Sequence, residues 1–216
     1  EGKAVIGVLD AVTAVRSALE SRGHNVRVVS LSPPFEQAVS SLNLKDDDMV
    51  FNLFEGFCGQ PQSEALLPAY LAERSIKFTG CTARAIRLGL DKAAVKRRLH
   101  LAAIPTPGYR VLNTSGIDAF PLAFPCIVKP CAEDASHGIT AESVVWNRAA
   151  LEHQVYKVCM TYHGDALVEE FLDGREFNAT VIGRGNNIRI LPVSEIEYSF
   201  PPDMPHLLTY SAKWEP

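Results

Sequence analysis

The 216-residue sequence has no block of like charge, no apolar run near the roughly 18 residues that cross a bilayer, and no basic-then-apolar export pattern at its N-terminus. Its net charge is only −4, which argues against a nucleic-acid-binding surface. Its five cysteines lack C-x-x-C spacing, and its six histidines lack H-E-x-x-H spacing. The sequence therefore predicts a cytoplasmic protein with reduced thiols, no metal site among these residues, and no membrane or nucleic-acid partner.

The first part of the chain alternates between short apolar runs and segments with helical spacing. Strands are predicted at residues 4–9, 26–31, 49–53 and 76–78, and helices at residues 12–22 and 65–74. Strands that alternate with helices favour a parallel, doubly wound sheet. We therefore expect a Rossmann-like α/β domain over residues 1–91.

After residue 91 the predicted strands follow one another more closely. Asp91 is suited to cap a helix over residues 92–103, and a second helix is predicted at residues 149–161. Strands are predicted at residues 109–112, 126–129, 167–171, 176–182 and 191–196. Strands that neighbour strands indicate an antiparallel α+β unit, so we expect a second domain over residues 92–216.

The most informative stretch is an apolar strand that ends at Lys129 and is followed by a loop of small and polar residues. The ammonium of Lys129, held next to Pro130, is suited to neutralise a phosphate or to meet an adenine nitrogen. Ala135, Ser136 and Gly138 are small enough to let backbone N–H groups approach phosphate oxygens. A lysine that only reaches solvent and an ordinary exposed turn explain the same residues, so the pattern alone leaves both interpretations open.

A second candidate region is the strand at residues 167–172 and the turn that follows it. The backbone there is able to bind an adenine edge, and Glu176 beyond the turn is placed to accept hydrogen bonds from ribose hydroxyls. The alternative is a plain hairpin with exposed carboxylates. Lys92 and Lys213 add separated cations, and Tyr210 lies three residues before Lys213. Scattered lysines are usually solvated, so these residues gain meaning only together with the other motifs.

Eight short segments stand out when they are taken in order along the chain. The segments are Phe78-Thr79-Gly80, Leu90-Asp91-Lys92, Ile104-Pro105-Thr106-Pro107, Ile127-Val128-Lys129-Pro130, Glu133-Asp134-Ala135-Ser136, Val168-Glu169-Glu170-Phe171, Gly174-Arg175-Glu176-Phe177 and Tyr210-Ser211-Ala212-Lys213. Their order and spacing resemble the D-alanine–D-alanine ligase branch of the ATP-grasp superfamily. The resemblance extends from about residue 48 to the end of the sequence. It implies that residues 92–216 form an ATP-grasp domain whose C-terminal part is absent.

This resemblance implies an ATP-dependent carboxylate–amine ligase. In such enzymes a carboxylate attacks the γ-phosphate of ATP, and an amine then captures the acyl phosphate to form an amide, while lysines and Mg²⁺ spread the negative charge. Nucleotide binding is implied for Lys92, Lys129, Glu133, Ala135, Ser136, Gly138, Glu169, Glu170, Phe171, Leu172 and Glu176, and catalysis for Lys213, Tyr210 and Glu55. The Mg²⁺ ligands are expected beyond Pro216, so the 216 residues alone should bind nucleotide weakly and not complete catalysis. The likeness also makes a homodimer plausible.

The sequence departs from the ligase pattern at several positions. Glu55-Gly56 stands where the ligases carry His-Gly, Trp214 stands where they carry tyrosine, and no glycine- and serine-rich loop follows Leu9. We therefore expect small carboxylate and amine substrates that differ from those of a cell-wall ligase, with Glu55 either binding the amine or capping a turn. The abrupt step from Leu9 into the next helix predicts that a loop is missing there, with a Cα separation between Leu9 and Asp10 far above ~3.8 Å.

Two alternatives to the ligase stay open. A nucleotide-binding pseudoenzyme or regulatory module would keep the adenine pocket without turnover. A biotin-carboxylase-like or purine-pathway ATP-grasp enzyme shares the lysine and the loop, but the Gly-Arg-Glu-Phe and Tyr-Ser-Ala-Lys segments favour the ligase branch. The leading interpretation requires Lys129, Glu176 and Lys213 to converge around a single triphosphate.

Overall fold

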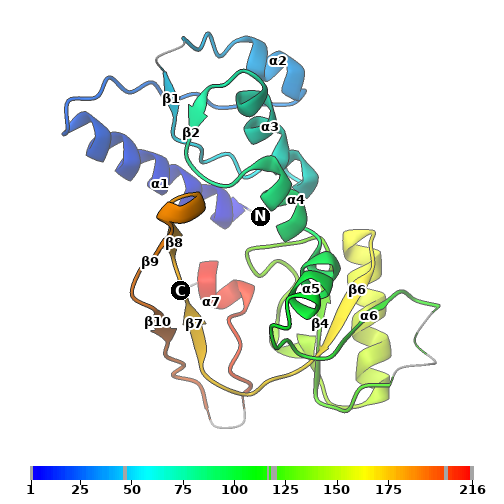
Figure 1. Cartoon of the computed structure of the whole chain (residues 1–216). Helices are drawn as coiled ribbons and strands as arrows, with labels where there is room; N and C mark the ends of the chain where they lie inside the picture. Colours follow the sequence, from blue (N-terminus) through cyan, green and yellow to red (C-terminus); the bar gives the residue numbers. More distant parts are fainter. Residues whose placement is uncertain (1, 46–47, 116, 118–120, 202–203, 215–216) are drawn as a thin grey trace. The chain divides into compact units, whose positions relative to one another are not determined.

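The computed structural model describes residues 2–45, 48–115, 117, 121–201 and 204–214, with side chains from residue 7 onward. The chain divides into two compact units (Figure 1). The first unit is formed by the described parts of Glu1–Thr106, Cys131–Ala135 and Trp214–Pro216, and the second by those of Pro107–Pro130 and Ser136–Lys213. Each unit is described by itself. No helix among the described residues combines the length and apolar character needed to cross a membrane.

The first unit begins with a long helix, α1 (Gly2–Glu20), where a strand and then a helix were expected. The helix runs without interruption through Leu9 and Asp10, and the Thr13 hydroxyl donates to the Leu9 carbonyl at 2.9 Å. The predicted strand at residues 4–9 and the predicted missing loop are therefore wrong. A short apolar run fits either a strand or a helix by its pattern, and only a helix satisfies its backbone hydrogen bonds without a neighbouring strand.

The rest of the first unit is built from short helices around a small apolar core. Its elements are α2 (Phe35–Ser40), β1 (Met49–Val50), η1 (Pro61–Ala65), α3 (Leu66–Glu73), β2 (Lys77–Phe78), α4 (Ala83–Gly89) and α5 (Lys92–Leu101). Val39, Leu42, Leu67 and Leu71 form the buried core. Strands β1 and β2 pair in parallel, but residues 26–31 form no strand. Among the described residues, the predicted parallel sheet is thus limited to two short strands.

Helix α5 confirms the sequence signals at both of its ends. The carboxylate of Asp91 accepts a hydrogen bond from the Ala94 amide at 2.8 Å, which satisfies a backbone donor in the first turn. The helix ends just before Ala103, whose φ of 54° reverses the chain ahead of the Ile104-Pro105 segment. This cap fixes the position of Lys92, the first residue of the helix.

The second unit is centred on a four-stranded sheet in the order β3-β6-β4-β5, in which every pairing is antiparallel. The strands are β3 (Tyr109–Leu112), β4 (Cys126–Pro130), β5 (Val144–Val145) and β6 (Ala166–Glu170), with η3 (Ala141–Ser143) before β5. Helix α6 (Arg148–Tyr162) packs on the sheet and contacts β4, β5 and β6 (Figure 1). The core includes Val128, Leu151, Val155 and Val168, all at 0% exposure. The predicted antiparallel α+β arrangement is confirmed here.

An extended arm continues from the sheet. Its elements are β7 (Glu176–Asn178), β8 (Val181–Ile182), η4 (Gly185–Asn187), β9 (Arg189–Ile190) and β10 (Ser194–Ile196), and the chain then reaches α7 (Tyr210–Trp214). Strand β7 pairs antiparallel with β10, and β8 pairs antiparallel with β9. The strands predicted at residues 176–182 and 191–196 are therefore present, although each is shorter than expected.

Candidate functional site

The end of β4 places Lys129 beside a buried carboxylate on β6. Lys129 Nζ lies 2.7 Å from Glu169 Oε2, and the side chain of Glu169 is only 7% exposed, against 30% for that of Lys129. The pairing follows from the antiparallel register, in which Ile127 faces Glu169 and Lys129 faces Leu167. A buried carboxylate is costly without a partner, so the lysine neutralises it. Two predicted nucleotide-binding residues are thus in direct contact.

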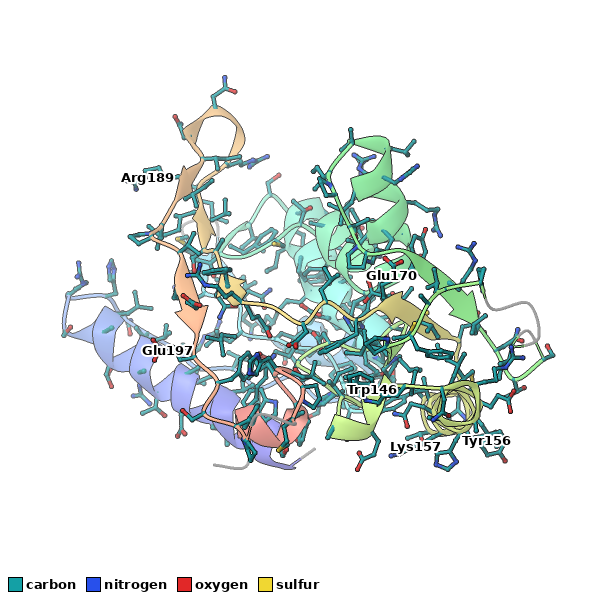
Figure 2. All side chains as sticks on the ribbon, turned by 90° about the horizontal axis from the view of Figure 1, so that it is seen from below. Trp146, Tyr156, Lys157, Glu170, Arg189 and Glu197 are labelled. Atoms are coloured by element: carbon teal, nitrogen blue, oxygen red, sulfur yellow. The ribbon has the colours of Figure 1, made fainter. Side chains whose placement is uncertain are left out.

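The segment that leaves β6 is held by backbone hydrogen bonds. The amide of Glu170 donates to Gly108 O at 3.0 Å, and the Gly108 amide donates to Glu170 Oε2 at 2.9 Å. The amide of Phe171 donates to Pro125 O at 3.1 Å. Glu170 marks the end of β6 in Figure 2, and Leu172, two residues later, is 68% exposed. The predicted adenine-binding segment is therefore anchored at Glu170 and Phe171 and open to solvent at Leu172.

The loop after β4 has an unusual backbone. Ala135, Ser136 and Gly138 have φ values of 46°, 63° and 75°, so three of its residues adopt the left-handed region. Such conformations cost energy for residues other than glycine and persist where the surrounding structure holds them. Successive N–H groups in turns with left-handed residues form a concave surface that suits an anion. The sequence predicted this loop from its small side chains alone.

Within the first unit, Lys92 is tied to the start of the same loop. Its backbone N–H donates to Cys131 O at 3.3 Å, and its ammonium donates to the carbonyl of Glu133. Two further predicted positions, Lys92 and Glu133, are therefore in contact. The contact uses the backbone of Glu133, which the residue type could not reveal.

The segment before α7 and the start of α7 form hydrogen bonds with the loop after β4. Within the second unit, the Ser136 hydroxyl donates to Leu208 O at 2.9 Å and the Tyr210 amide donates to Ile139 O at 3.1 Å. The rings of His137 and Tyr210 lie 5.3 Å apart at 37°. Among the described residues the buried Tyr210 hydroxyl has no hydrogen-bond partner, and Lys213, one turn later, is exposed. Ser136 and Tyr210 are thus brought close together.

In the first unit, the indole of Trp214 adds a hydrogen bond to the same loop. Its Nε1–H donates to the carbonyl of Ala135 at 3.2 Å. The sequence marked Trp214 only as a departure from the ligase pattern. An indole N–H is a donor without acceptor capacity, so a backbone carbonyl is a suitable partner for it.

Glu176 is engaged by a tyrosine that the sequence did not single out. The hydroxyl of Tyr198 donates to Glu176 Oε2, and burial followed by this hydrogen bond raises the pKa of the Tyr198 phenol. Next to Tyr198 is an open hollow of about 650 Å³, lined by Asp173, Gly174, Arg175, Glu195, Ile196, Glu197, Tyr198, Ser199 and His206. Figure 2 shows Glu197, one residue before Tyr198, on this arm.

Glu55 belongs to a group of carboxylates in the first unit. The pKa of Glu64 is raised, first by burial and then by the negative charges of Asp134 and Glu55. The neighbouring Gly56 has a φ of 89°, and a Cβ there would lie 3.0 Å from the Glu64 amide nitrogen. Both the backbone conformation and the close approach therefore require glycine at this position. Glu55 itself is exposed.

Comparison with known proteins settles the family. The sequence profile described as "D-ala D-ala ligase C-terminus" matches residues 104–215, about half of the chain. The chain belongs to the D-alanine–D-alanine ligase family. A D-alanine–D-alanine ligase of Gluconobacter oxydans is 30% identical over 184 residues, which cover 85% of this chain and 57% of that protein. An uncharacterized protein of Sinorhizobium fredii, y4sG, is 32% identical over 166 residues, which cover 77% of this chain and 47% of that protein.

Solved structures show the same fold. D-alanine–D-alanine ligase from Helicobacter pylori superposes with a TM-score of 0.57 at 24% identity, over 70% of this chain and 47% of that one. L-amino acid ligase from Bacillus licheniformis superposes with a TM-score of 0.50 at 22% identity, over 70% of this chain and 34% of that one. The fold is thus that of the ATP-grasp ligases. This family member spans about half the length of the curated relatives that it matches.

Only some of the predicted site residues of this D-alanine–D-alanine ligase family member are in contact with one another. The structure joins Lys129 with Glu169, and Lys92 with Glu133, but it pairs Glu176 with Tyr198. The convergence of Lys129, Glu176 and Lys213 around a triphosphate stays a prediction. Within the described residues, no group of three or more His, Cys, Asp and Glu side chains could hold a metal ion.

Proposed function

We propose that the chain carries the ATP-binding part of an ATP-dependent carboxylate–amine ligase. The observation that carries the proposal is the pairing of Lys129 with the buried Glu169 at the strand ends that lead into the left-handed loop and the solvent-open Leu172 segment. A cation, a buried acceptor and a curved loop backbone together suit a nucleotide, which presents a base and phosphates. Family membership supports the same interpretation.

ATP fits the residues that are present. Glu169 and the backbone of residues 170–172 would form hydrogen bonds with the adenine edge. The Leu172 amide would be the donor, because the amides of Glu170 and Phe171 already bind Gly108 O and Pro125 O. Glu176 would accept from the ribose hydroxyls. Lys129, Lys92 and the N–H groups of Ala135, Ser136 and Gly138 would hold the phosphates. Mg²⁺ does not fit in the same way, because the described residues supply no metal-binding group.

The proposed reaction couples phosphoryl transfer to amide formation. Bound ATP supplies the phosphoryl group: a substrate carboxylate oxygen bonds to the γ-phosphorus as ADP leaves, and the amine nitrogen then bonds to the acyl carbon as phosphate leaves. The lysines would stabilise the charge on the phosphoryl oxygens, with Lys213 nearest the terminal phosphate. The loop fastened by Ser136 and Trp214 would exclude water from the acyl phosphate, with Tyr210 as part of that cover.

Glu55 is the residue that we propose for the amine substrate. The carboxylates of Glu55, Glu64 and Asp134 are close enough to raise the pKa of Glu64, so the local potential favours a cation. The relatives whose names state a substrate are D-alanine–D-alanine ligases, and one structural neighbour is an L-amino acid ligase. We therefore propose amino acids or small peptides as the substrate class.

The test of this function has two parts. A thermal-shift screen with ATP and a panel of D- and L-amino acids should show stabilisation by ATP, increased by one of the amino acids. In a protein that also carries the C-terminal part of the ATP-grasp domain, release of ADP and phosphate should then require both an acid and an amine. Absence of any ATP-dependent stabilisation would contradict the nucleotide site. Sedimentation of the same samples tests the homodimer that the family likeness suggests.

A regulatory module that binds nucleotide without turnover is the second candidate. The observation in its favour is that Lys129 and Glu176, two groups proposed to face the nucleotide, already have partners in Glu169 and Tyr198. Under this proposal, ATP stabilises the protein, but no combination of acids and amines releases ADP even when the C-terminal part of the ATP-grasp domain is present. Release of ADP that depends on both substrates excludes it.

A further inference from the structure

We propose that Tyr198 is a positioning residue that fixes the carboxylate of Glu176 for recognition of a ribose diol. The proposal rests on the proposed ATP site and adds a residue to it. Tyr198 follows β10 and belongs to none of the eight short segments that resemble the ligase family, although it lies within the residues that the family profile matches. Its role is inferred from the contacts of the arm alone.

The sheet register brings the two side chains to the same face. Ile196 on β10 pairs with Glu176 on β7, and Tyr198 lies two residues beyond Ile196. Because side chains alternate along an extended chain, Tyr198 projects on the side of Ile196 and reaches Glu176. Its hydroxyl donates to Oε2 of the carboxylate. A carboxylate accepts several hydrogen bonds, so Oε1 stays available for ribose hydroxyls.

The Tyr198 ring contacts two other aromatic rings. It stacks on His206 with a centroid distance of 5.3 Å and an interplanar angle of 3°, and it lies 5.4 Å from Phe200 at 35°. His206 Nδ1 is in turn 3.6 Å from Asp173 Oδ1, in the turn just before β7. Contacts therefore run from Asp173 through the rings of His206 and Tyr198 to the carboxylate of Glu176. A carboxylate held in this way loses less conformational entropy when a ligand binds.

Two other charged groups that line the same hollow, Arg175 and Glu195, are paired with each other. Arg175 forms a bidentate ion pair with Glu195, with N–O distances of 2.6 and 2.7 Å. The Arg175 guanidinium also lies 4.8 Å from the centroid of the Phe177 ring. Arg175 is thus directed toward Glu195, whereas Glu176 accepts a hydrogen bond from the neutral Tyr198 hydroxyl. A neutral donor leaves the negative charge of Glu176 in place to attract hydroxyl protons.

The experiment compares ATP with 2′,3′-dideoxy-ATP, measured by isothermal titration calorimetry on the 216-residue chain. The variants are Tyr198→Phe, which keeps the ring stack and removes the hydroxyl, and Tyr156→Phe as the matched control. Tyr156 is 57% exposed on α6 (Figure 2). We expect the wild-type chain and the control to prefer ATP by about tenfold, the size of a hydrogen bond to a charged group. In Tyr198→Phe the preference should fall toward one, with dideoxy-ATP bound as in the wild type.

Several results would overturn the proposal. One is an unchanged preference for ATP over dideoxy-ATP in Tyr198→Phe, and another is equal binding of both nucleotides by the wild type. The third is tighter ATP binding by Tyr198→Phe than by the wild type, because it would mean that Tyr198 competes with the ribose for Glu176. If the wild type binds neither nucleotide, the proposed ATP site fails and the ribose role fails with it.

A second measurement does not need ATP and separates the two failures. Isotope-labelled tyrosine NMR follows the ionisation of Tyr198 in the wild type and in Glu176→Gln. The wild-type phenol should ionise well above the ordinary value of 10.0, and Glu176→Gln should shift its ionisation to lower pH because the carboxylate no longer accepts its proton. If Tyr198 ionises at the same pH in the wild type and in Glu176→Gln, its hydroxyl does not hold the Glu176 carboxylate, and this result does not depend on ATP binding.

Discussion

The four-stranded sheet with α6 and the arm from β7 to β10 belong to the same unit but bury their apolar residues very differently. In the sheet, Val128, Leu151 and Val168 are completely buried. In the arm, many large apolar side chains are more than 40% exposed: Phe177, Val181, Ile182, Ile188, Ile190, Leu191 and Val193. Two-stranded ribbons are marginally stable in water, so the arm depends on cross-strand contacts where the sheet depends on its core.

This difference in burial indicates that different interactions position the residues of the proposed nucleotide site in the sheet and in the arm. Lys129 and Glu169 lie on strands packed against α6, so their geometry is set by the core. Glu176 lies on the arm, where Tyr198 and the Arg175–Glu195 pair replace a core as the source of order. We therefore expect substitutions in the sheet to change global stability and those in the arm to change local geometry.

The largest expected effect is on the core of the sheet. Leu151→Ala removes a fully buried side chain on α6 and should lower the free energy of unfolding by about 3 kcal/mol, because transfer and cavity terms add. Ile190→Ala in the arm, at 69% exposure, should change it by less than about 0.5 kcal/mol. Urea denaturation measures both. Equal losses in the two variants would contradict the comparison.

An effect of about the same size is expected for the ion pair in the sheet, compared with the ion pair in the arm. Lys129→Met removes the ammonium that lies 2.7 Å from the buried carboxylate of Glu169, which should cost about 3 kcal/mol. Adding Glu169→Leu removes the buried charge and should recover most of the loss. Arg175→Met breaks the exposed pair in the arm and should leave global stability nearly unchanged. If Arg175→Met lowers the free energy of unfolding more than Lys129→Met does, the claim that the sheet and not the arm determines global stability is contradicted.

Two glycines give a comparison of intermediate size. Gly138 has a φ of 75°, and a Cβ there would lie 2.8 Å from Pro130 Cγ and 2.9 Å from Tyr162 Cε2. Gly138→Ala should therefore lower the free energy of unfolding by about 2 kcal/mol. A Cβ at Gly174 in the arm would meet no described atom within 4 Å, and Gly174→Ala should be close to neutral. Thermal unfolding of the two variants decides between a strained loop and an unconstrained one.

The smallest effect is a pH dependence in the arm. The hydrogen bond and charge of Arg175 hold the pKa of Glu195 below its ordinary value of 4.5. A lowered folded-state pKa stabilises the protein above the ordinary value, and that stabilisation is lost as pH falls through the folded-state value. The difference in melting temperature between the wild type and Glu195→Gln should thus exist at neutral pH and vanish in acid. The melting temperature of Arg175→Met should differ from that of the wild type at neutral pH and not in acid. If the difference grows in acid, the Arg175–Glu195 pair is not its cause.

Local signals predicted the elements that local interactions determine. The Asp91 cap located α5, and the apolar runs ending at Lys129 and Glu170 located β4 and β6. The N-terminal run was misassigned because an apolar segment of that length fits a strand as well as part of a longer helix. The parallel sheet expected around it shrank for the same reason, since α1 supplies no strand.

The contacts of the site were harder to predict because they join residues far apart in the sequence. The sequence indicated Lys129 and Glu169 separately, but their pairing depends on the β4–β6 register. Tyr198 had no motif, and only its spacing of two residues from Ile196 could have placed it on the face of Glu176. Trp214 was noticed as a departure, whereas its hydrogen bond to a backbone carbonyl has no sequence signature.

The most direct test of the central claim is calorimetric titration of ATP into the wild-type chain and into the double variant Lys129→Met with Glu169→Leu. The double variant removes the proposed nucleotide-facing pair without leaving a buried charge, so we expect it to keep its fold. The account predicts saturable binding by the wild type that weakens by about tenfold or more in the double variant. Binding that is the same in both proteins, or absent from the wild type, would contradict it.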